Sequence, residues 1–365
     1  MSFIDQVNHP FPLIEIQGNS TERGFEYGTK CRDLINRRID ILRNIIKSNI
    51  FFNVTWSDVL KKAKIFLSSI RQYDPQIVEE LDGIAEGAER SFDEILLLNV
   101  IYEFFSLNVD GVWSGCTAVA ITPESSLKSK TIVGQNDDWN EVFQDVSVLL
   151  KIDQEQGPRI VQFCDAGTIG GNGFNSEGIS LCGNSLLSNN WNWKGIPHMI
   201  LKRGALNAMT LSDAIRAITS ARRCSSHNYL LAHSQGEAVD IETAPHEVSF
   251  LMPQEGILTH SNHFVTQKPN IQDLKVNKSP NSIIRKHRSS KLLQKKNGSI
   301  TVDTVKEMFR DHFDFPHSIC RHPSPENTAF HQIQTNASII MDLTNSRLFL
   351  TRGTPCKNEY SCFQF

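Results

Sequence analysis

The stretch VWSGCTAVAI at residues 112–121 marks a change in the character of the chain. Upstream of it, apolar residues recur at intervals of three and four, as on the buried face of a helix. Downstream, short β-branched segments alternate with turn residues, as in strands. Gly115 and Cys116 stand where the first strand is expected to begin. The sequence therefore predicts a helical part, residues 1–115, followed by a strand-rich part, residues 116–365.

The order of the predicted elements indicates an α+β fold. Blocks of strands alternate with pairs of helices, which is typical of helix layers that cover stacked sheets. The strands are short and linked by tight turns, which favours antiparallel pairing. Helices are expected at 20–47, 59–70, 75–84, from about 91, and at 197–208, 212–221, 283–295 and 302–312. Strands are expected at 116–123, 130–136, 146–153, 159–166, 229–234, 237–243, 248–252, 337–343 and 347–353.

The composition excludes several classes of protein. The 37 basic and 40 acidic residues of the 365-residue chain give a net charge of −3, unlike a protein that binds nucleic acid through a broad basic surface. The most apolar run, at 94–105, is too short to cross a membrane. Neither terminus resembles a targeting signal, so we expect a cytoplasmic protein without nucleic-acid or membrane partners. We interpret the Lys-, Asn-, Ser- and Arg-rich segment 266–300 as a solvated surface insertion.

The cysteines do not suggest a metal centre. None of the eight forms a C-x-x-C pair, so a zinc ribbon or a thioredoxin-like site is not expected. His312, His317, Cys320 and His322 offer imidazole and thiol ligands, but their spacing matches no established short zinc pattern. We therefore expect neither a metal nor a cofactor.

The bond between Gly115 and Cys116 suits self-cleavage. The thiol of Cys116 could attack the carbonyl carbon of Gly115 and shift the chain from nitrogen to sulfur, after which water would release the thioester. Glycine favours this attack because it lacks a Cβ that would shield the carbonyl. The product would begin with Cys116, whose α-amino group, with an ordinary pKa of about 7.7–8.0, could act as the base in later turnovers.

Five segments in a preserved order carry a resemblance to a known family. The five segments are SGCTAVAI at 114–121, GQNDDW at 134–139, DAGTIGGNGFNSEGIS at 165–180, HSNHF at 260–264 and HSICRH at 317–322. They resemble segments of the self-processing N-terminal nucleophile (Ntn) hydrolases classed as C45 peptidases, which include acyl-coenzyme A:isopenicillin N acyltransferases and insect β-alanyl-dopamine hydrolases. The resemblance implies a four-layer αββα sandwich, with residues 1–115 as a pro-segment or α-subunit and residues 116–365 as the catalytic β-subunit.

The resemblance also implies roles for single residues. Cys116 would be both the self-cleaving residue and the nucleophile of turnover. Asp138 would position the α-amino group or a substrate amine, although the adjacent Asp137 leaves open which carboxylate faces the site. Asn262 would donate a hydrogen bond to the oxyanion. Arg321 would pair with the substrate or with Asp138. The structural alternatives are turn positions for Asp138 and Asn262 and a salt bridge for Arg321.

Other residues of these segments leave two interpretations open. Gly167, Gly170, Gly173 and Gly178 are expected to shape tight turns beside the site. Asn175 would either reach the site or hold a turn.

Two departures from the penicillin enzyme bear on the substrate. His227 stands where that enzyme has a serine. The loop 189–195 carries Trp191 and Trp193, which would either bind an aromatic amine or pack within a surface loop.

The resemblance implies an enzyme. We expect a zymogen that becomes a heterodimer of its own fragments and then acts as a cysteine amidohydrolase on a small N-acyl amine, such as β-alanyl-dopamine. The alternative is an acyl-coenzyme A-dependent N-acyltransferase of the isopenicillin N type, with acyl-coenzyme A as donor. A second alternative is an uncleaved, non-catalytic Ntn-fold binding protein.

Overall fold

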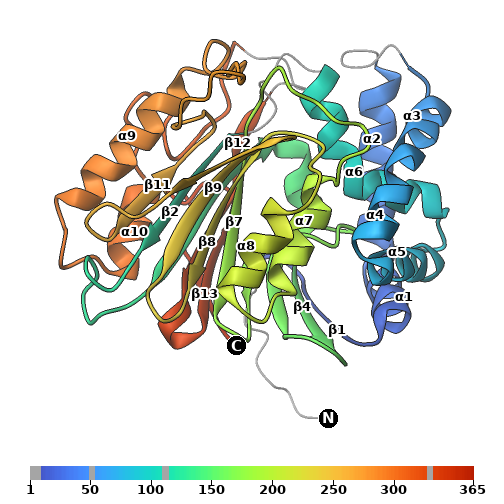
Figure 1. The fold of residues 1–365 in the computed structure, drawn as a ribbon, viewed down its shortest axis with the longest axis horizontal. Helices are drawn as coiled ribbons and strands as arrows, with labels where there is room; N and C mark the ends of the chain where they lie inside the picture. The colour runs from blue at the N-terminus through green and yellow to red at the C-terminus, as the bar shows by residue number, and fades with distance from the viewer. Residues whose placement is uncertain (1–9, 49–53, 109–114, 327–331) are drawn as a thin grey trace.

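Two β-sheets lie face to face, and helices cover the outer face of each (Figure 1). The computed structural model describes residues 10–48, 54–108, 115–326 and 332–365. The predicted α+β class and αββα layering are confirmed. All but one of the described strand pairs are antiparallel, as the short linkers indicated.

Within the described residues, the larger sheet has eight strands and the smaller has six. In spatial order the larger sheet contains β1 (Leu13–Gly18), β4 (Ser147–Gln154), β5 (Ile160–Asp165), β6 (Asn172–Asn175), β7 (Ile179–Ser185), β8 (His227–His233), β9 (Ala238–Ala244) and β10 (Glu247–Leu251). The smaller sheet contains β11 (Ile257–His260), β2 (Gly115–Ile121), β3 (Ile132–Asn140), β12 (Ile333–Asp342), β13 (Arg347–Arg352) and β14 (Ser361–Gln364).

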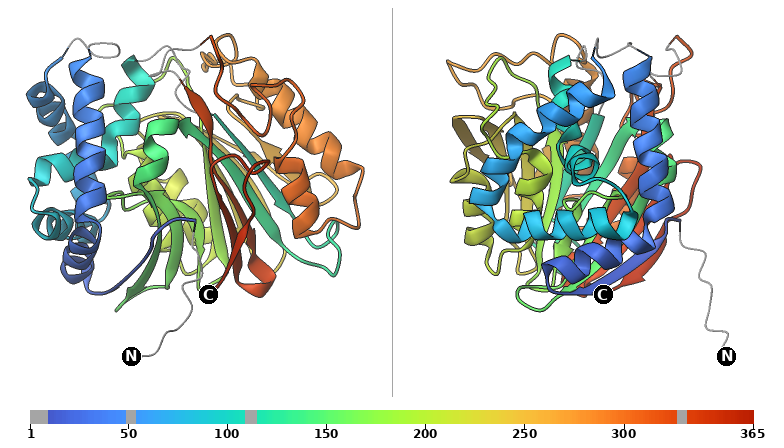
Figure 2. Two further views of the ribbon diagram at one scale, coloured as in Figure 1. Left: turned by 180° about the vertical axis from the view of Figure 1, so that it is seen from behind. Right: turned by 90° about the vertical axis from the view of Figure 1, so that its right-hand side faces the viewer.

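The helices form the two outer layers, which Figure 2 shows from two further directions. The larger sheet is covered by α1 (Ser20–Lys30), α2 (Arg32–Lys47), α3 (Trp56–Ala63), α4 (Leu67–Tyr73), α5 (Pro75–Ala88), α6 (Phe92–Asn108), α7 (His198–Leu206) and α8 (Leu211–Thr219). The smaller sheet is covered by α9 (Asn281–Gln294) and α10 (Val302–Phe309). Among the described helices, none combines the length and apolarity that crossing a bilayer requires.

Strand β2 shows why the chain after Gly115 is almost uniformly apolar. Side chains alternate between the two faces of a strand. Ala118 and Ala120 therefore face the larger sheet, whereas Val119 and Ile121 pack against α9 and α10. Because both faces of β2 are buried, each position favours an apolar residue.

The N-terminal part differs from its helical prediction in three ways. Residues 59–70, predicted as one helix, belong to α3 and α4, which a 3₁₀ turn at Lys64–Phe66 separates. Residues 20–47 form two helices, α1 and α2, which meet at Cys31. Residues Leu13–Gly18 form the edge strand β1, which pairs in parallel with β4. Strand β4 lies more than a hundred residues further along the chain, so no local sequence pattern could predict this pairing. The N-terminal part thereby completes the sheet of the C-terminal part.

A buried ion-pair network also joins the two parts. Glu80 on α5 accepts hydrogen bonds from Arg23 of α1 at 2.9 Å and from Nη2 of Arg203 of α7 at 2.8 Å. All three side chains are almost fully buried. Removing the carboxylate would leave two guanidinium groups in the interior without their anion.

We expect Glu80→Ala to lower the free energy of unfolding by about 3–5 kcal/mol, because it breaks a buried ion-pair network. The neighbouring exposed Glu79 is the matched control, and Glu79→Ala should change stability by no more than about 0.5 kcal/mol. Thermal unfolding followed by circular dichroism measures both. Equal midpoints for the two variants would show that the network contributes nothing to stability.

Candidate functional site

The first two sequence segments of the resemblance are neighbours in the smaller sheet. Strand β2 pairs with β3 so that Gly115 lies opposite Asp138 and Cys116 lies opposite Asp137. The residues just before Gly115, 109–114, lie outside the described part of the chain. The division of the chain at this bond therefore stays a prediction.

The thiol of Cys116 is buried beside a carboxyl group. Its Sγ lies 3.7 Å from Oδ1 of Asp137. Burial raises the pKa of Cys116 well above its ordinary value, and the carboxylates of Asp137 and Asp138 raise it further. The resting group is therefore the neutral thiol, and a nucleophilic role requires a base that removes its proton.

The backbone of Cys116 is held by an amide and a guanidinium group. The N–H of Cys116 donates to Oδ1 of Asn262 at 2.8 Å. Nη2 of Arg285 donates to the same Oδ1 at 2.8 Å, and its Nη1 donates to the carbonyl oxygen of Cys116 at 2.5 Å. Because Oδ1 accepts two hydrogen bonds, the amide orientation of Asn262 follows from its partners. Its Nδ2 donates to the carbonyl oxygen of Ser185 at 3.1 Å.

Arg285 is a site residue that the sequence analysis missed. It belongs to α9, within the segment 266–300 that we interpreted as a solvated insertion. That interpretation is wrong at this position, because Arg285 is only 1% exposed. It is also wrong at Lys275, which is buried and donates to Oγ of Ser185 at 2.6 Å. The one available signal was the HSNHF segment shortly before, which places the start of this region near the site.

Asp138 and Arg321 flank Gly115 on the other side of the strand. A Cβ built on Gly115 would lie 2.8 Å from Nη1 of Arg321 and 3.0 Å from Oδ2 of Asp138, so glycine fits best there. Oδ1 of Asp138 accepts a hydrogen bond from Thr335 at 2.7 Å. Burial raises the pKa of Asp138, although Arg285 and Arg321 oppose the shift.

The two adjacent carboxylates face different surroundings. Side chains of neighbouring strand residues point to opposite faces. Asp137 lines the cavity beside the thiol, and Asp138 lies beside Gly115 and Arg321. Burial raises the pKa of Asp137 to about 6, against the opposing charge of Lys202. Both carboxylates thus border the Gly115–Cys116 pair.

A cavity of about 70 Å³ opens onto the thiol of Cys116. Its aromatic wall comes from Tyr102, Trp139 and Phe163. Its charged groups include Asp137, Asp165 and Lys202. The Nζ of Lys202 donates to Oδ1 of Asn172 at 2.6 Å, and burial lowers the pKa of this lysine.

The glycine-rich segment lies beside this cavity. Gly170 lines it, and a Cβ there would lie 2.0 Å from the carbonyl oxygen of Met199, so only glycine allows this approach. Gly167 and Gly178 have φ of +82° and +80°, as expected for turn positions. Asn175 holds a turn, because its Oδ1 accepts from two backbone N–H groups and its Nδ2 donates to two carbonyl oxygens.

The two loop tryptophans lie outside the cavity lining. The rings of Trp191 and Trp193 pack edge to face with centroids 5.4 Å apart. Trp193 also contacts Phe66 and Phe104, with centroids 5.9 and 6.2 Å away. Of the two alternatives for this loop, its packing favours the structural one.

His227 lines the cavity and stacks on a second imidazole. Its ring centroid lies 3.7 Å from that of His198. Burial lowers the pKa of His227 to about 3, and Lys202 lowers it further, so the ring is neutral near pH 7. A neutral imidazole can donate or accept one hydrogen bond at each nitrogen but carries no charge.

A second group of polar side chains lies outside this cavity. His312, Cys320 and His322 come together with Cys356, whereas His317 is not part of the group. The spacing argument gave no reason to expect this cluster, and it did not include Cys356 at all.

The comparisons with known proteins identify the family of the chain. The family model described as acyl-coenzyme A:6-aminopenicillanic acid acyl-transferase matches residues 126–355, which is more than half of the chain. The 40 kDa form of acyl-coenzyme A:6-aminopenicillanic-acid-acyltransferase from Emericella nidulans is 29% identical over 311 residues, which cover 84% of each protein.

Solved structures give more distant likenesses. Penicillin V acylase from Agrobacterium tumefaciens has a TM-score of 0.43 at 13% identity, covering 65% of this chain and 83% of the acylase. A mutant conjugated bile acid hydrolase from Clostridium perfringens has a TM-score of 0.44 at 11% identity, covering 68% of this chain and 97% of the hydrolase.

The family match confirms the resemblance stated from the five segments, and with it the expectation of an enzyme rather than a non-catalytic binding protein. The cut at Gly115–Cys116 and the substrate stay predictions. The chain belongs to the acyl-coenzyme A:6-aminopenicillanic acid acyl-transferase family.

Proposed function

We propose that this enzyme cleaves its own chain before Cys116 and then hydrolyses a small N-acylated amine through an acyl-Cys116 intermediate. The observation that carries the proposal is the hydrogen bond from the N–H of Cys116 to Oδ1 of Asn262. That nitrogen is the leaving group of the proposed cut. Asn262 therefore holds the Gly115–Cys116 bond close to the thiol that we propose breaks it.

Groups beside Cys116 can supply and accept the protons that the processing step requires. Sγ of Cys116 attacks the carbonyl carbon of Gly115, and the carbon–nitrogen bond breaks. The thiol proton passes to a nearby base, and the nitrogen of Cys116 gains a proton as it leaves. Asp137 supports the first transfer, because its carboxylate is 3.7 Å from the sulfur and its pKa of about 6 makes it mostly ionised near pH 7. Water then hydrolyses the thioester.

The same groups support turnover. Once the bond to Gly115 is cut, the new α-amino group of Cys116 can take the thiol proton. Asp138 and Arg321 would border the space beside it, where they can pair with an amine or a carboxylate. The Nδ2 of Asn262 donates to the carbonyl oxygen and to Oγ of Ser185, which also lines the cavity, and would exchange one of these hydrogen bonds for one to the oxyanion of a tetrahedral intermediate.

The cavity supports a small substrate with an aromatic part. Tyr102, Trp139 and Phe163 provide an apolar wall. Asp137 and Asp165 provide negative charge for an ammonium group. The lining therefore matches the chemical character of a β-alanyl conjugate of an aromatic amine, such as β-alanyl-dopamine, and the walls of the cavity of about 70 Å³ would have to move apart to admit a molecule of that size.

Acyl transfer is the second candidate, and the family match favours it. The fungal relative is named for acyl-coenzyme A and 6-aminopenicillanic acid. Both reactions share the acyl-cysteine intermediate and differ only in whether water or an amine receives the acyl group. Acyl-coenzyme A would then be the donor.

We expect Cys116→Ala to abolish both the cut and turnover. On a denaturing gel the wild type should give fragments of 115 and 250 residues, and the variant a single band of 365 residues. Cys164→Ala is the matched control, because Cys164 is a buried thiol in the same cavity and should leave the cut intact. N-terminal sequencing of active wild type should read Cys-Thr-Ala-Val. A cut in the Cys116→Ala protein would assign the chemistry to another group.

A substrate panel separates hydrolysis from transfer. We expect processed enzyme to release free amine from N-acyl amines without any thioester, because water can enter the cavity and attack the thioester of Cys116. Mass spectrometry of the products measures this release, and the uncut Cys116→Ala protein is the blank. Product that forms only when acyl-coenzyme A and an amine are both present would favour transfer instead.

A further inference from the structure

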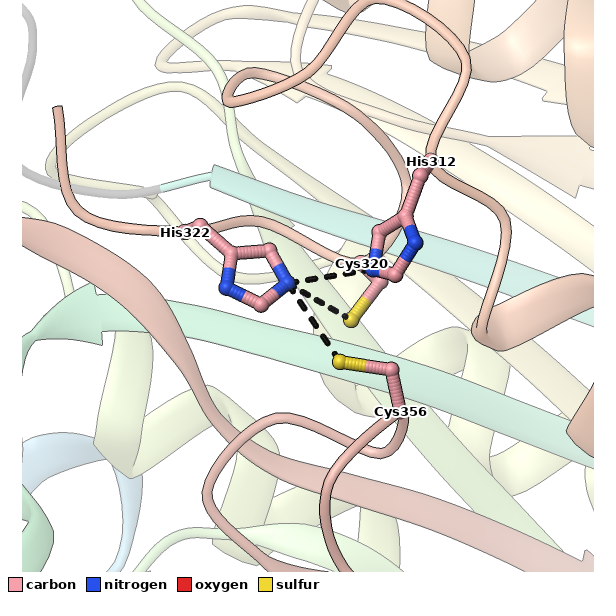
Figure 3. Close-up of side chains that lie close together, drawn as sticks. All are labelled: His312, Cys320, His322 and Cys356. Atoms are coloured by element: carbon pink, nitrogen blue, oxygen red, sulfur yellow. Dashed lines mark hydrogen bonds between the residues drawn. The ribbon is translucent and has the colours of Figure 1, made fainter.

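Four potential metal ligands meet between two segments that are distant in sequence. His312, Cys320 and His322 lie in the loop after α10, and Cys356 lies in the turn between β13 and β14. One ligand atom of each lies within 4.8 Å of the others. Figure 3 shows the two imidazoles and two thiols pointing toward a common centre.

The Nε2 atom of His322 has more polar neighbours than it can hydrogen-bond. Nε2 of His322 lies 3.1 Å from Nε2 of His312, 3.6 Å from Sγ of Cys320 and 3.4 Å from Sγ of Cys356. An imidazole nitrogen either donates one hydrogen bond or accepts through one lone pair. Hydrogen bonding therefore cannot pair His322 with all three neighbours at once. A cation at the common centre can bind all four atoms.

Three of the six separations match the edges of a tetrahedral zinc site, and the other three pairs of ligand atoms, which lie within 4.8 Å, would close by up to about 1 Å on binding. Zinc binds sulfur at about 2.3 Å and nitrogen at about 2.0–2.1 Å, so the edges of a tetrahedral site are about 3.4 Å for two nitrogens and about 3.6 Å for nitrogen and sulfur. The distances from Nε2 of His322 differ from these values by about 0.3 Å or less. Two thiolates and two imidazoles are a ligand set typical of structural zinc.

The backbone already holds the ligands in place. The N–H of Cys320 donates to the carbonyl oxygen of Asp311 at 3.0 Å, and the N–H of His322 donates to that of Pro316 at 2.9 Å. Nε of Arg310 donates to the carbonyl oxygen of Pro355 at 2.8 Å, next to Cys356. The first two bonds hold the loop 311–322 together, and the third joins the end of α10 to the turn that carries Cys356, so little chain ordering is left for metal binding to do.

We propose that His312, Cys320, His322 and Cys356 form a structural zinc site. The four protein ligands fill a tetrahedral sphere and leave no position for a substrate. None of the four lines the cavity beside Cys116, so this site is separate from the candidate active site. Binding replaces the two thiol protons, which are released to solvent.

The site also fixes Arg321, which lies between two of the ligands. Cys320 and His322 would be anchored to the metal, while Arg321 reaches toward Gly115 from the opposite side of the chain. The ligands would thus be positioning residues for Arg321. This consequence depends on the proposed role of Arg321, but metal binding itself does not.

The test uses the full chain in the Cys116→Ala form, so that the Cys116 thiol cannot bind metal and self-cleavage plays no part. Reduced protein purified from zinc-supplemented medium should contain about one zinc ion per chain by elemental analysis. After zinc removal, Co²⁺ should produce thiolate-to-cobalt charge-transfer absorption and the intense visible bands of tetrahedral cobalt. Added zinc should abolish both.

Variants identify the ligands. Cys356→Ser and His312→Ala remove the half-buried thiol and the exposed imidazole, and each should weaken Co²⁺ binding by about tenfold or more. Cys362→Ser and His287→Ala, an exposed cysteine and an exposed histidine outside the cluster, should bind like the parent. A chelator should lower the melting temperature of the parent and of these controls, but not of the combined Cys356→Ser, His312→Ala protein.

Three results would overturn the proposal. The first is folded, reduced parent protein that takes up neither zinc nor Co²⁺. The second is a charge-transfer band that is equally strong in the ligand variants. The third is a native disulfide between Cys320 and Cys356 in place of bound metal, which thiol counting and intact mass would reveal. None of these results bears on whether the wild type cuts itself before Cys116.

Discussion

The hydrogen bond between the N–H of Cys116 and Oδ1 of Asn262 is the contact on which the arrangement of the site depends. It lies in the interior, where an unpaired amide is costly, so both groups are tightly constrained. The same oxygen also receives Arg285, which in turn holds the carbonyl of Cys116. A single side-chain oxygen therefore holds the backbone of Cys116 in place and accounts for a buried guanidinium group.

The charges around this contact oppose one another. Burial raises the pKa of Asp137 to about 6 and lowers that of Lys275 to about 7 and that of Arg321 to about 10. Each of these shifts reduces the difference between the pKa values of the acidic and the basic side chains. A buried site with carboxylates and cations close together can thus hold groups that change protonation near neutral pH, as the proposed acyl chemistry at a thiol requires.

The N-terminal part is a structural component of the sandwich rather than a cover laid over it. Strand β1 extends the larger sheet, and Glu80 connects α1 to α7 in the interior. Two fragments produced by the proposed cut would share a sheet and a buried ion-pair network. Separating them would expose both, which is a physical reason for a cleaved chain to remain one folded unit.

The sequence by itself determined the class of fold and the order of the site segments, and it predicted Cys116 as the nucleophile. Short β-branched segments, helical periodicity and turn residues are local patterns, so they can be recognised without knowing which segments pair in the fold. The family resemblance, and no local pattern, placed Asp138 near the predicted nucleophile, and the register of β2 and β3 sets it opposite Gly115. The place of Arg285 in the site could not be predicted from the sequence, because a basic residue within a basic segment gives no sign of burial.

Only the tertiary structure decided which distant side chains meet. It paired β1 with β4 and packed the rings of Trp191 and Trp193 against each other outside the cavity lining. It also gave Asp137 and Asp138 different surroundings. It also gathered Cys356 with the histidines and cysteine of a loop more than thirty residues away. Contacts between such distant segments depend on how the sheets and helix layers pack against one another. The spacing of residues along the chain does not reveal this packing, because a folded sheet brings together residues that are far apart in sequence.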